Sequence, residues 1–299
     1  MALTMAMLTL KSEADQKLRE SGSGVPRDLV VFPRIDQKTC LKSIYTANLT
    51  PLVVEPVIEG DECRTNVKEI EKLLSSPPTA DRILCVLSTT STFAPRVYDS
   101  VVEIAELCQK FNVAHVINSA YGLQCSRISS DIVQADKKGR VDVLISSTDK
   151  NFMVPVGGSI LYAPAPKDKS QKVNIIQKIN KFYPGRASGA PIMDLFITYL
   201  EMGEINFKEL LRQRKENFNY LKEELEKVAE KVGERVLQTT KNNKISIAFT
   251  LTSLNDQVFT PNNIDATFFG SYLFHRRVSG VRVCVNSRGK AAKVGMSTF

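Results

Sequence analysis

Three polar or charged side chains lie where a parallel sheet would form a binding site. Asn118 and Lys150 each come shortly after an apolar, strand-like segment, and Arg186 follows the turn formed by residues 183–185. Ligands of open α/β sheets bind outside the carboxyl ends of the strands. The positions of these three side chains therefore make them candidates for binding or catalysis.

Lys150 is followed by the apolar residues 152–156 and by the glycine pair Gly157 and Gly158. A lysine amine among apolar side chains is easier to deprotonate, and the free amine condenses with an aldehyde cofactor. The glycines would let the backbone pass close to such a ligand. A single lysine after a strand is more often a surface residue, and that alternative stays open at this point.

Asn118 and Arg186 each have a functional and an ordinary interpretation. Asn118 could direct its amide at a ring nitrogen of a cofactor, or it could simply tolerate an unusual turn conformation. Arg186 could capture a phosphate or carboxylate with its guanidinium fork, or it could be a solvated loop residue. The hydroxyl run 88–91 could likewise contact a cofactor or cap a turn.

The elements that must position these residues show the pattern of a doubly wound sheet. A helix is predicted over residues 98–112 from one apolar face, with Ser100 and Glu103 as a capping box. Strands alternating with such helices indicate parallel crossover units and an α/β fold with a mainly parallel sheet. The predicted strands are residues 29–32, 52–55, 82–87, 115–117, 141–146 and 159–162.

The chain is long enough for a large domain and a smaller one. A long amphipathic helix over residues 206–232 and an alternating strand over 244–251 place the start of a smaller α+β domain at Asn206, so the large domain spans residues 1–205 and the small one 206–299. Residues 1–10 indicate a buried helix, too short to cross a bilayer, and residues 12–27 a surface loop.

Composition excludes some chemistry. Only two histidines are present, and the six cysteines are scattered without a C-x-x-C pair, so we expect neither a metal site nor a Ser-His-Asp triad. Free thiols in a reducing compartment are the simplest interpretation. The net charge of +8 suits a phosphate-bearing partner without proving one.

Several phrases of the sequence together resemble one family, the O-phosphoseryl-tRNA(Sec):selenocysteinyl-tRNA(Sec) synthases, also called selenium transferases. The lysine motif at 149–158, Asp-Lys-Asn-Phe-Met-Val-Pro-Val-Gly-Gly, is long and specific. The other matching phrases are residues 32–38, 88–90, 93–96, 118–124, 183–188 and 277–280. The resemblance implies the fold-type-I architecture of pyridoxal-phosphate enzymes, with a smaller C-terminal α+β domain.

The resemblance also implies roles for individual residues. Lys150 matches the lysine that forms a Schiff base with pyridoxal 5'-phosphate, Asn118 matches the residue near the pyridine ring, and Arg186 matches an arginine that grips the substrate phosphate. Lys137 stands where the family has a tRNA-contacting arginine. The implied reaction converts O-phosphoseryl-tRNA(Sec) to selenocysteinyl-tRNA(Sec) through a cofactor aldimine and loss of phosphate, with selenophosphate as the selenium donor.

The resemblance further implies a cytoplasmic protein without membrane association, and a homotetramer among full-length family members. It implies a chain truncated at both ends: relatives carry an amino-terminal region with a phosphate-holding glycine loop, and the pattern is expected to end after Arg282, with residues 283–299 divergent. Two alternatives remain. One is a related pyridoxal enzyme that acts on a free amino acid or makes cysteinyl-tRNA, and the other is a silent subunit that binds RNA or a full-length partner.

Overall fold

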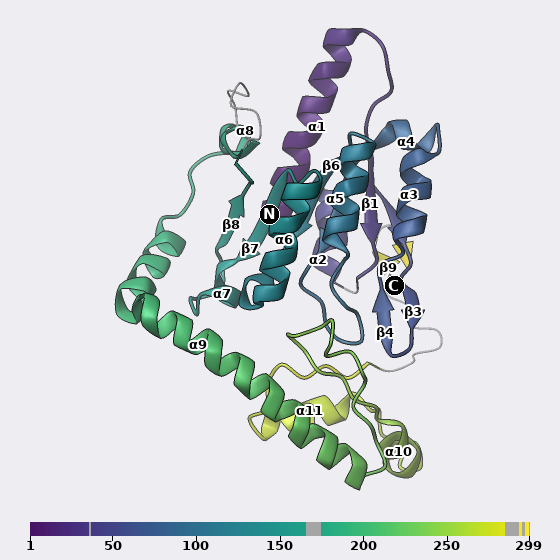
Figure 1. The fold of residues 1–299 in the computed structure, drawn as a ribbon, viewed down its shortest axis with the longest axis vertical. Coiled ribbons are helices and arrows are strands. Elements are labelled where there is room, and N and C mark those ends of the chain that lie inside the picture. Colours follow the sequence, from purple (N-terminus) through teal and green to yellow (C-terminus); the bar gives the residue numbers. More distant parts are fainter. Residues whose placement is uncertain (36, 166–174, 285–292, 295–296, 299) are drawn as a thin grey trace.

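A six-stranded sheet forms the centre of the molecule (Figure 1). The computed structural model describes all of the chain except residues 36, 166–174, 285–292, 295–296 and 299. Within the sheet all neighbours are parallel except the last pair, which is antiparallel. The strands in spatial order are β2 (Thr50–Val54), β1 (Leu29–Pro33), β5 (Ile83–Thr89), β6 (Ala114–Asn118), β7 (Val143–Ser147) and β8 (Ser159–Tyr162).

Helices cover both faces of this sheet, because its central strands are apolar on both sides. Along β1, Val30 and Phe32 face one apolar cluster, and Leu29 and Val31 face another. The first cluster holds side chains of α1 (Ala2–Ser21), α2 (Lys38–Thr46) and α8 (Ile175–Phe182). The second face packs against α3 (Val67–Ser75), α5 (Val101–Lys110) and α6 (Ser126–Lys138). The prediction of a mainly parallel α/β fold is therefore confirmed.

The remaining elements are short or lie outside the sheet. The antiparallel pairs are a hairpin of β3 (Val57–Glu59) and β4 (Glu62–Arg64), and a pair of β9 (Lys293–Val294) and β10 (Ser297–Thr298). The helices are α4 (Thr79–Arg82), α7 (Thr148–Asn151), α9 (Ala190–Lys231), α10 (Thr252–Leu254) and α11 (Phe268–His275), with a 3-10 turn at Gly122–Gln124 and a π turn at Asn255–Phe259.

The amino-terminal helix is longer than predicted. Residues 1–10 were expected to form a buried helix, and Leu3, Met7 and Leu10 are indeed buried in α1. The expected loop from residue 12 is wrong up to Ser21, because the helix continues through the polar residues and ends only where Gly22 adopts φ 64°. Only the first half of α1 packs against the sheet, so only that half needs an apolar face.

The predicted strand over residues 244–251 does not form. Among the described residues, this segment contributes only an isolated bridge between Val236 and Phe249. The Asn243 side chain accepts hydrogen bonds from the backbone amides of Ile245 and Ser246, both at 3.0 Å. Hydrogen bonds from backbone amides to a nearby side chain compete with the hydrogen bonds of a strand ladder. Here the Asn243 side chain takes the amides of residues 245 and 246.

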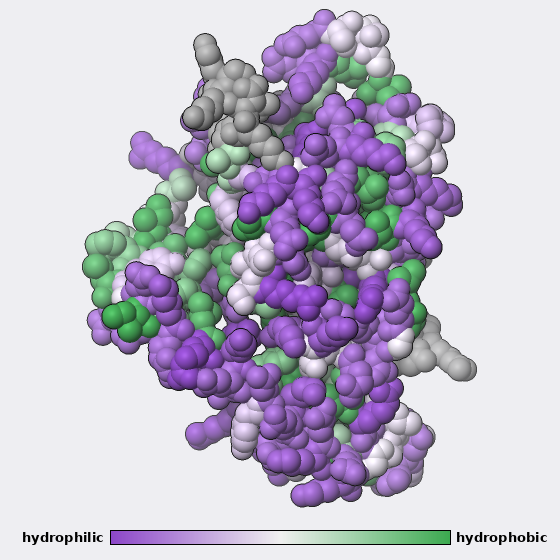
Figure 2. All heavy atoms as spheres, in the orientation of Figure 1, coloured by the Kyte–Doolittle hydropathy of each residue, from purple (hydrophilic) through white to green (hydrophobic). Residues whose placement is uncertain are grey.

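Helix α9 begins before the predicted residue 206 and is broken at Gly203, whose φ of 64° and ψ of 172° are not helical. Its first half exposes apolar side chains, visible as green spheres near α9 in Figure 2. We call this surface the α9 apolar face. It consists of Ile192, Phe196, Ile197, Leu200 and Ile205, which are between 56% and 83% exposed.

The segment after α9 is tied to the β3–β4 hairpin by polar contacts. Arg235 makes a two-pronged ion pair with Asp61, at 2.6 and 2.8 Å, and Asn242 donates to both carboxylate oxygens of Glu62. Among the described helices, none combines the length and the apolar composition that a membrane span requires.

Candidate active site

The ends of the neighbouring strands β5, β6 and β7 bring two of the candidate residues, Asn118 and Lys150, to one edge of the sheet. In the ladder, Asn118 at the end of β6 is paired with Thr89 of β5 and with Ile145 of β7. Lys150 lies in the single-turn helix α7, which follows β7 directly. The structure therefore places Asn118 and Lys150 at the same carboxyl edge, as the sequence predicts.

Helix α7 is fastened to the segment that follows Asn118. The side-chain amide of Asn151 donates to the carbonyl oxygens of Ala120 and Ser147, at 2.8 and 2.7 Å. The side chain of Gln124 donates to the carbonyl oxygen of Lys150. These contacts join the two candidate segments at fixed positions.

The Asn118 side chain is held by a hydrogen bond to a cysteine of helix α2. Asn118 is buried, and its Nδ2 donates a hydrogen bond to Cys40 Sγ at 3.0 Å. The Cys40 thiol is buried in α2, and burial raises its pKa to about 12, so the thiol stays protonated and accepts through its lone pairs. The contact fixes the orientation of the Asn118 amide.

The expectation that Lys150 has a dry environment is wrong for this chain. The Lys150 side chain is 46% exposed, and its Nζ lies 2.9 Å from Asp149 Oδ2. Two of the apolar residues expected to cover Lys150, Phe152 and Met153, contact α9 or solvent instead. Phe152 packs against Tyr199 and Phe207 of α9, with ring centroids 5.7 and 6.2 Å away, and Met153 is 72% exposed.

Buried hydroxyl groups with unused hydrogen-bonding capacity gather at this edge. Thr90 Oγ1, Ser119 Oγ and Thr148 Oγ1 each have no hydrogen-bond partner among the described residues, and neither has Asn151 Oδ1. They follow β5, β6 and β7 respectively, with Asn151 in α7. Buried polar atoms in native proteins are nearly always bonded, so this cluster leaves hydrogen-bonding groups available to a polar ligand or to water.

Two glycines keep the space around these hydroxyls open. A Cβ atom on Gly122 would lie 2.5 Å from Ser119 Oγ and 2.7 Å from Thr90 Oγ1. A Cβ atom on Gly158 would lie 2.5 Å from Thr148 Oγ1 and 2.9 Å from Pro191 Cβ. The same distances show that Thr90 and Ser119 are close neighbours, and that the start of α9 approaches Thr148.

Arg186 is not in contact with the other candidates. It is exposed in the loop between α8 and α9, and within the described residues no hydrogen bond or ion pair holds its guanidinium. It precedes Pro191, which abuts Gly158, by five positions. Its loop thus runs into the site region, while its side chain is free to reorient.

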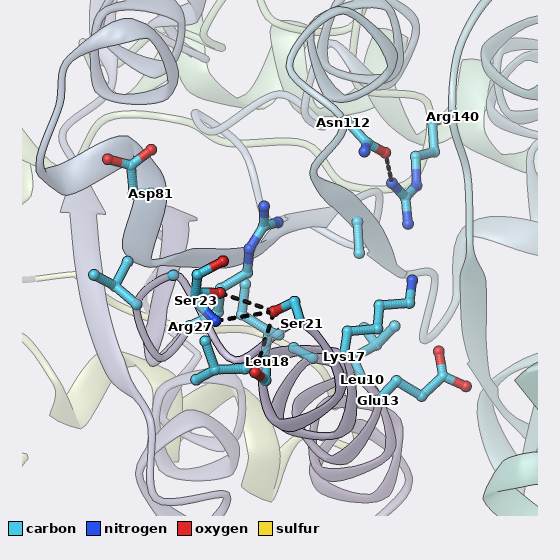
Figure 3. A pocket seen from close by; sticks show the side chains of 15 residues that line it. Leu10, Glu13, Lys17, Leu18, Ser21, Ser23, Arg27, Asp81, Asn112 and Arg140 are labelled. Carbon is cyan, nitrogen blue, oxygen red and sulfur yellow. Dashed lines mark hydrogen bonds between the residues drawn. The ribbon is translucent and has the colours of Figure 1, made fainter.

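Lys137 lies at the opposite edge of the sheet. It is exposed near the end of α6, which starts just after the β6 carboxyl end and runs back over 13 residues to the start of β7. At about 1.5 Å per residue the helix separates Lys137 from the site edge by roughly 18 Å. A cavity of about 540 Å³ also opens at this far edge, between the end of α1 and the starts of β5 and β6 (Figure 3). Neither feature belongs to the candidate site.

Thr90, Ser119 and Thr148 were not among the predicted site residues. A usable signal existed, because hydroxyl residues follow each of three consecutive strands at the positions where the edge forms. Cys40 gave no signal, since only the tertiary fold brings α2 beneath β6.

The chain matches the model of the O-phosphoseryl-tRNA(Sec) selenium transferase family over residues 16–295. The chain belongs to this family. The selenium transferase match runs past Arg282, so the prediction that the family pattern ends there is wrong. A selenium transferase of Dictyostelium discoideum is 45% identical over all of this chain and 60% of its own length.

The selenium transferase fold is also found among solved structures. An archaeal O-phosphoseryl-tRNA(Sec) selenium transferase is similar with a TM-score of 0.74 and 28% identity, over 93% of this chain and 58% of that one. Oryza sativa TDC with PLP and tryptamine shares the fold with a TM-score of 0.56 and 17% identity, over 79% and 50%. The architecture is that of fold-type-I enzymes. The chain spans 52–60% of the length of the first curated selenium transferases it matches.

Proposed function

We propose that this chain acts in the conversion of O-phosphoseryl-tRNA(Sec) to selenocysteinyl-tRNA(Sec), with selenophosphate as selenium donor and pyridoxal 5'-phosphate as cofactor. The observation that carries the proposal is the placement of Asn118 and Lys150 on one sheet edge, beside hydroxyls that lack partners. Both residues lie inside the region that matches the selenium transferase family.

The residues present at the site suit a phosphorylated pyridine aldehyde. Lys150 offers a primary amine that solvent reaches, and Thr90, Ser119 and Thr148 offer hydroxyl donors that are not used within the described chain. Asn118 would lie beside the pyridine ring. When bound, the cofactor would supply an aldehyde for attachment to Lys150 and a ring that withdraws electrons from the substrate.

The chain's own groups would then orient the substrate and move its protons. Lys150 Nζ would act as the base that takes the Cα proton of the phosphoseryl group. Arg186 would bind the phosphate that leaves, because a guanidinium fork matches phosphate oxygens and its loop leads toward Gly158. Asp149, 2.9 Å from the Lys150 amine, would hold that group in place between these steps.

RNA contacts would lie apart from the chemistry. Lys137 is our candidate for a contact with an RNA phosphate. It stands where the family has an arginine, and a lysine keeps the positive charge although it lacks the two-pronged guanidinium. Its place at the far sheet edge fits a large substrate that touches the protein at separate points. The net charge of +8 favours association with RNA.

Assembly and location complete the proposal. The α9 apolar face, with Leu200 69% and Ile205 83% exposed, is the kind of surface that protein partners cover, and we assign it to contacts between copies as in a homotetramer. The two domains are proposed to divide near residue 206, close to the break in α9 at Gly203. The six free cysteines suit the reducing cytoplasm.

The test is product formation from O-phosphoseryl-tRNA(Sec), with the donor varied. Selenocysteinyl-tRNA that appears only with selenophosphate, and is lost in Lys150→Ala, supports the proposal. Cysteinyl-tRNA made with a sulfur donor, or turnover of free phosphoserine, supports the related pyridoxal enzyme. RNA binding without any turnover supports a silent subunit.

A further inference from the structure

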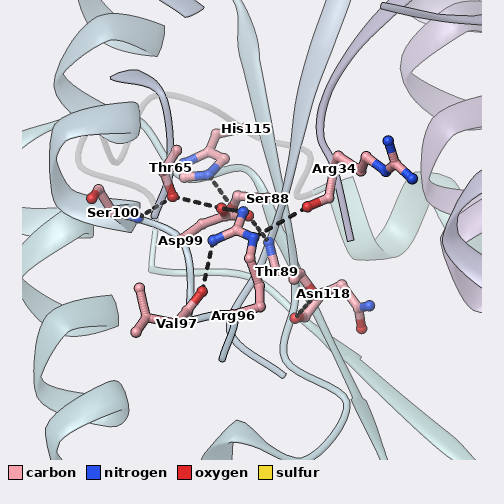
Figure 4. A network of polar contacts seen from close by, with 10 residues as sticks. All are labelled: Arg34, Thr65, Ser88, Thr89, Arg96, Val97, Asp99, Ser100, His115 and Asn118. Carbon is pink, nitrogen blue, oxygen red and sulfur yellow. Dashed lines mark hydrogen bonds and ion pairs between the residues drawn. The ribbon is translucent and has the colours of Figure 1, made fainter. Parts of the chain in front are cut away.

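A buried carboxylate lies beneath the candidate site and uses both of its oxygens. Asp99 is 0% exposed. Its Oδ2 accepts a hydrogen bond from the Thr89 backbone amide at 2.7 Å, and its Oδ1 accepts from Thr65 Oγ1 at 2.7 Å and from Arg96 Nη2 at 2.5 Å (Figure 4). A buried charge with this many partners is costly to place, and its neighbours then depend on it.

The positive partner is fixed as firmly as the carboxylate. Besides Asp99, Arg96 donates from Nε to the Arg34 carbonyl at 3.1 Å and from Nη1 to the Val97 carbonyl at 2.7 Å. Figure 4 shows the guanidinium among these acceptors, with Asp99 on one side. The ion pair is therefore locked to the backbone on both sides, and it cannot shift without moving the chain.

This ion pair is connected to Asn118 through a single residue. The Asp99 amide donates to the Thr89 carbonyl at 2.9 Å, so Asp99 and Thr89 bind each other in both directions. Thr89 Oγ1 in turn donates to the Asn118 carbonyl at 3.1 Å, and the Thr90 amide donates to the same oxygen at 2.9 Å. Each link lies at the carboxyl end of β5 or β6.

We propose that Asp99 is a positioning residue for the candidate site. Its hydrogen bonds fix the end of β5. They thereby fix the position from which Thr89 donates to the Asn118 carbonyl, and the position of the unpartnered Thr90 hydroxyl. The expected effect on cofactor attachment rests on the proposed function. The expected effect on the positions of β5 and β6 does not, and it can be measured without a cofactor. In this role Asp99 would act through its hydrogen bonds to Thr89.

A purely structural role would predict a different outcome, and the chain supplies a matched control. Asp142 lies at the opposite edge of the same sheet, and it too accepts a strand amide, that of His115 at 2.8 Å, and pairs with an arginine, Arg140, at 2.9 Å. Asp142→Asn should also weaken the fold, although by less than Asp99→Asn, because the Asp142 side chain is 19% exposed and that of Asp99 is 0% exposed. Only Asp99→Asn should disturb the site.

The experiment compares these two variants in the whole chain with two measurements. Amide hydrogen exchange is followed by mass spectrometry in peptides that contain residues 88–91 and 118–120. Binding of pyridoxal phosphate is titrated by the absorbance of the lysine-attached form. We expect Asp99→Asn to speed exchange in both peptides and to weaken attachment at least tenfold, with Asp142→Asn changing attachment by less than twofold.

Thr65→Val is the milder variant, because it removes one donor to Asp99 and keeps the buried charge pair. If Asp99→Asn does not fold, Thr65→Val should show the same two effects at smaller size. If exchange near Thr89 and Asn118 is unchanged in the folded variants, or if both aspartate variants weaken attachment equally, the positioning role is wrong. If the unaltered chain attaches no cofactor, the proposed function fails, and the exchange data alone decide the role of Asp99.

Discussion

Lys150 Nζ lies 2.9 Å from Oδ2 of its chain neighbour Asp149, so the amine of the candidate site is held in an ion pair. The Asp149 side chain is only 15% exposed, whereas that of Lys150 is 46% exposed. The carboxylate thus holds the amine at the site edge from the protein side. Solvent, and hence a small ligand, reaches the amine from the other side.

Asp149→Asn should speed the attachment of pyridoxal phosphate several-fold at neutral pH, since the amine no longer has to leave an ion pair. The measurement is the rate of the absorbance change after mixing. Asp149→Glu, which keeps the charge, is the control and should remain close to the unaltered chain. A slower rate in Asp149→Asn would show that the carboxylate assists attachment.

Gly122→Ala should close the space beside the unpartnered hydroxyls. The added methyl would lie 2.5 Å from Ser119 Oγ and 2.7 Å from Thr90 Oγ1, so we expect at least tenfold weaker cofactor attachment. Overpacking should also cost about 1–3 kcal/mol of stability. Gly189→Ala is the control, because a Cβ there meets nothing within 4 Å. Equal attachment in both variants would show that the space beside Gly122 is not used.

His115 should make the protein less stable as the pH falls. Burial lowers its pKa to about 4 from 6.5; the imidazole is enclosed in β6, with Nε2 2.7 Å from Ser88 Oγ. The unfolded chain therefore binds a proton at higher pH than the folded chain does. The free energy of unfolding should be unaffected by His115 above about pH 6.5, and should fall by about 1.4 kcal/mol per pH unit between about pH 6.5 and 4.

Urea unfolding at pH 7 and pH 5 measures this effect. Other groups titrate in the same range, so the relevant quantity is the difference between the unaltered chain and His115→Gln, which lacks the titrating ring. We expect the pH-dependent loss to be smaller by roughly 2 kcal/mol in His115→Gln. An equal loss in both proteins would mean that His115 is protonated in the folded state.

The α9 apolar face should mediate assembly. Leu200→Glu, at a position 69% exposed, should shift the chain toward a smaller species in light scattering at micromolar concentration, because a charge in an apolar contact is costly. Tyr220→Glu is a matched substitution on the same helix beyond the Gly203 break, at a position 65% exposed. If both variants have the mass of the unaltered chain, this face is not the contact.

The central strands of the sheet could be predicted from the sequence because they are mostly buried and largely apolar. The segments predicted around Leu29, Ile83, Ala114, Val143 and Ser159 all form strands, and their order along the chain gives the crossover pattern. A strand buried on both faces is determined mainly by its own composition. The co-location of Asn118 and Lys150 follows from that pattern alone.

Contacts between distant segments could not be predicted in this way. The strand expected at 244–251 pairs only at the bridge between Val236 and Phe249, and its start is a turn capped by Asn243. The predicted capping box does not form, because the Ser100 hydroxyl makes no cap hydrogen bond. The prediction that apolar residues cover Lys150 was wrong because Phe152 packs against Tyr199 of α9, which is distant in the sequence. Likewise, nothing near Asn118 in the sequence indicates Cys40 or Asp99.

The most direct test of Lys150 as the attachment site is to trap the cofactor on the chain. Pyridoxal phosphate is added, the adduct is reduced with borohydride, and the modified peptide is mapped by mass spectrometry, with Lys150→Ala as the control. We expect one modified side chain, Lys150, and no attachment at the site in the control. A label on another lysine, or equal labelling in Lys150→Ala, would contradict it.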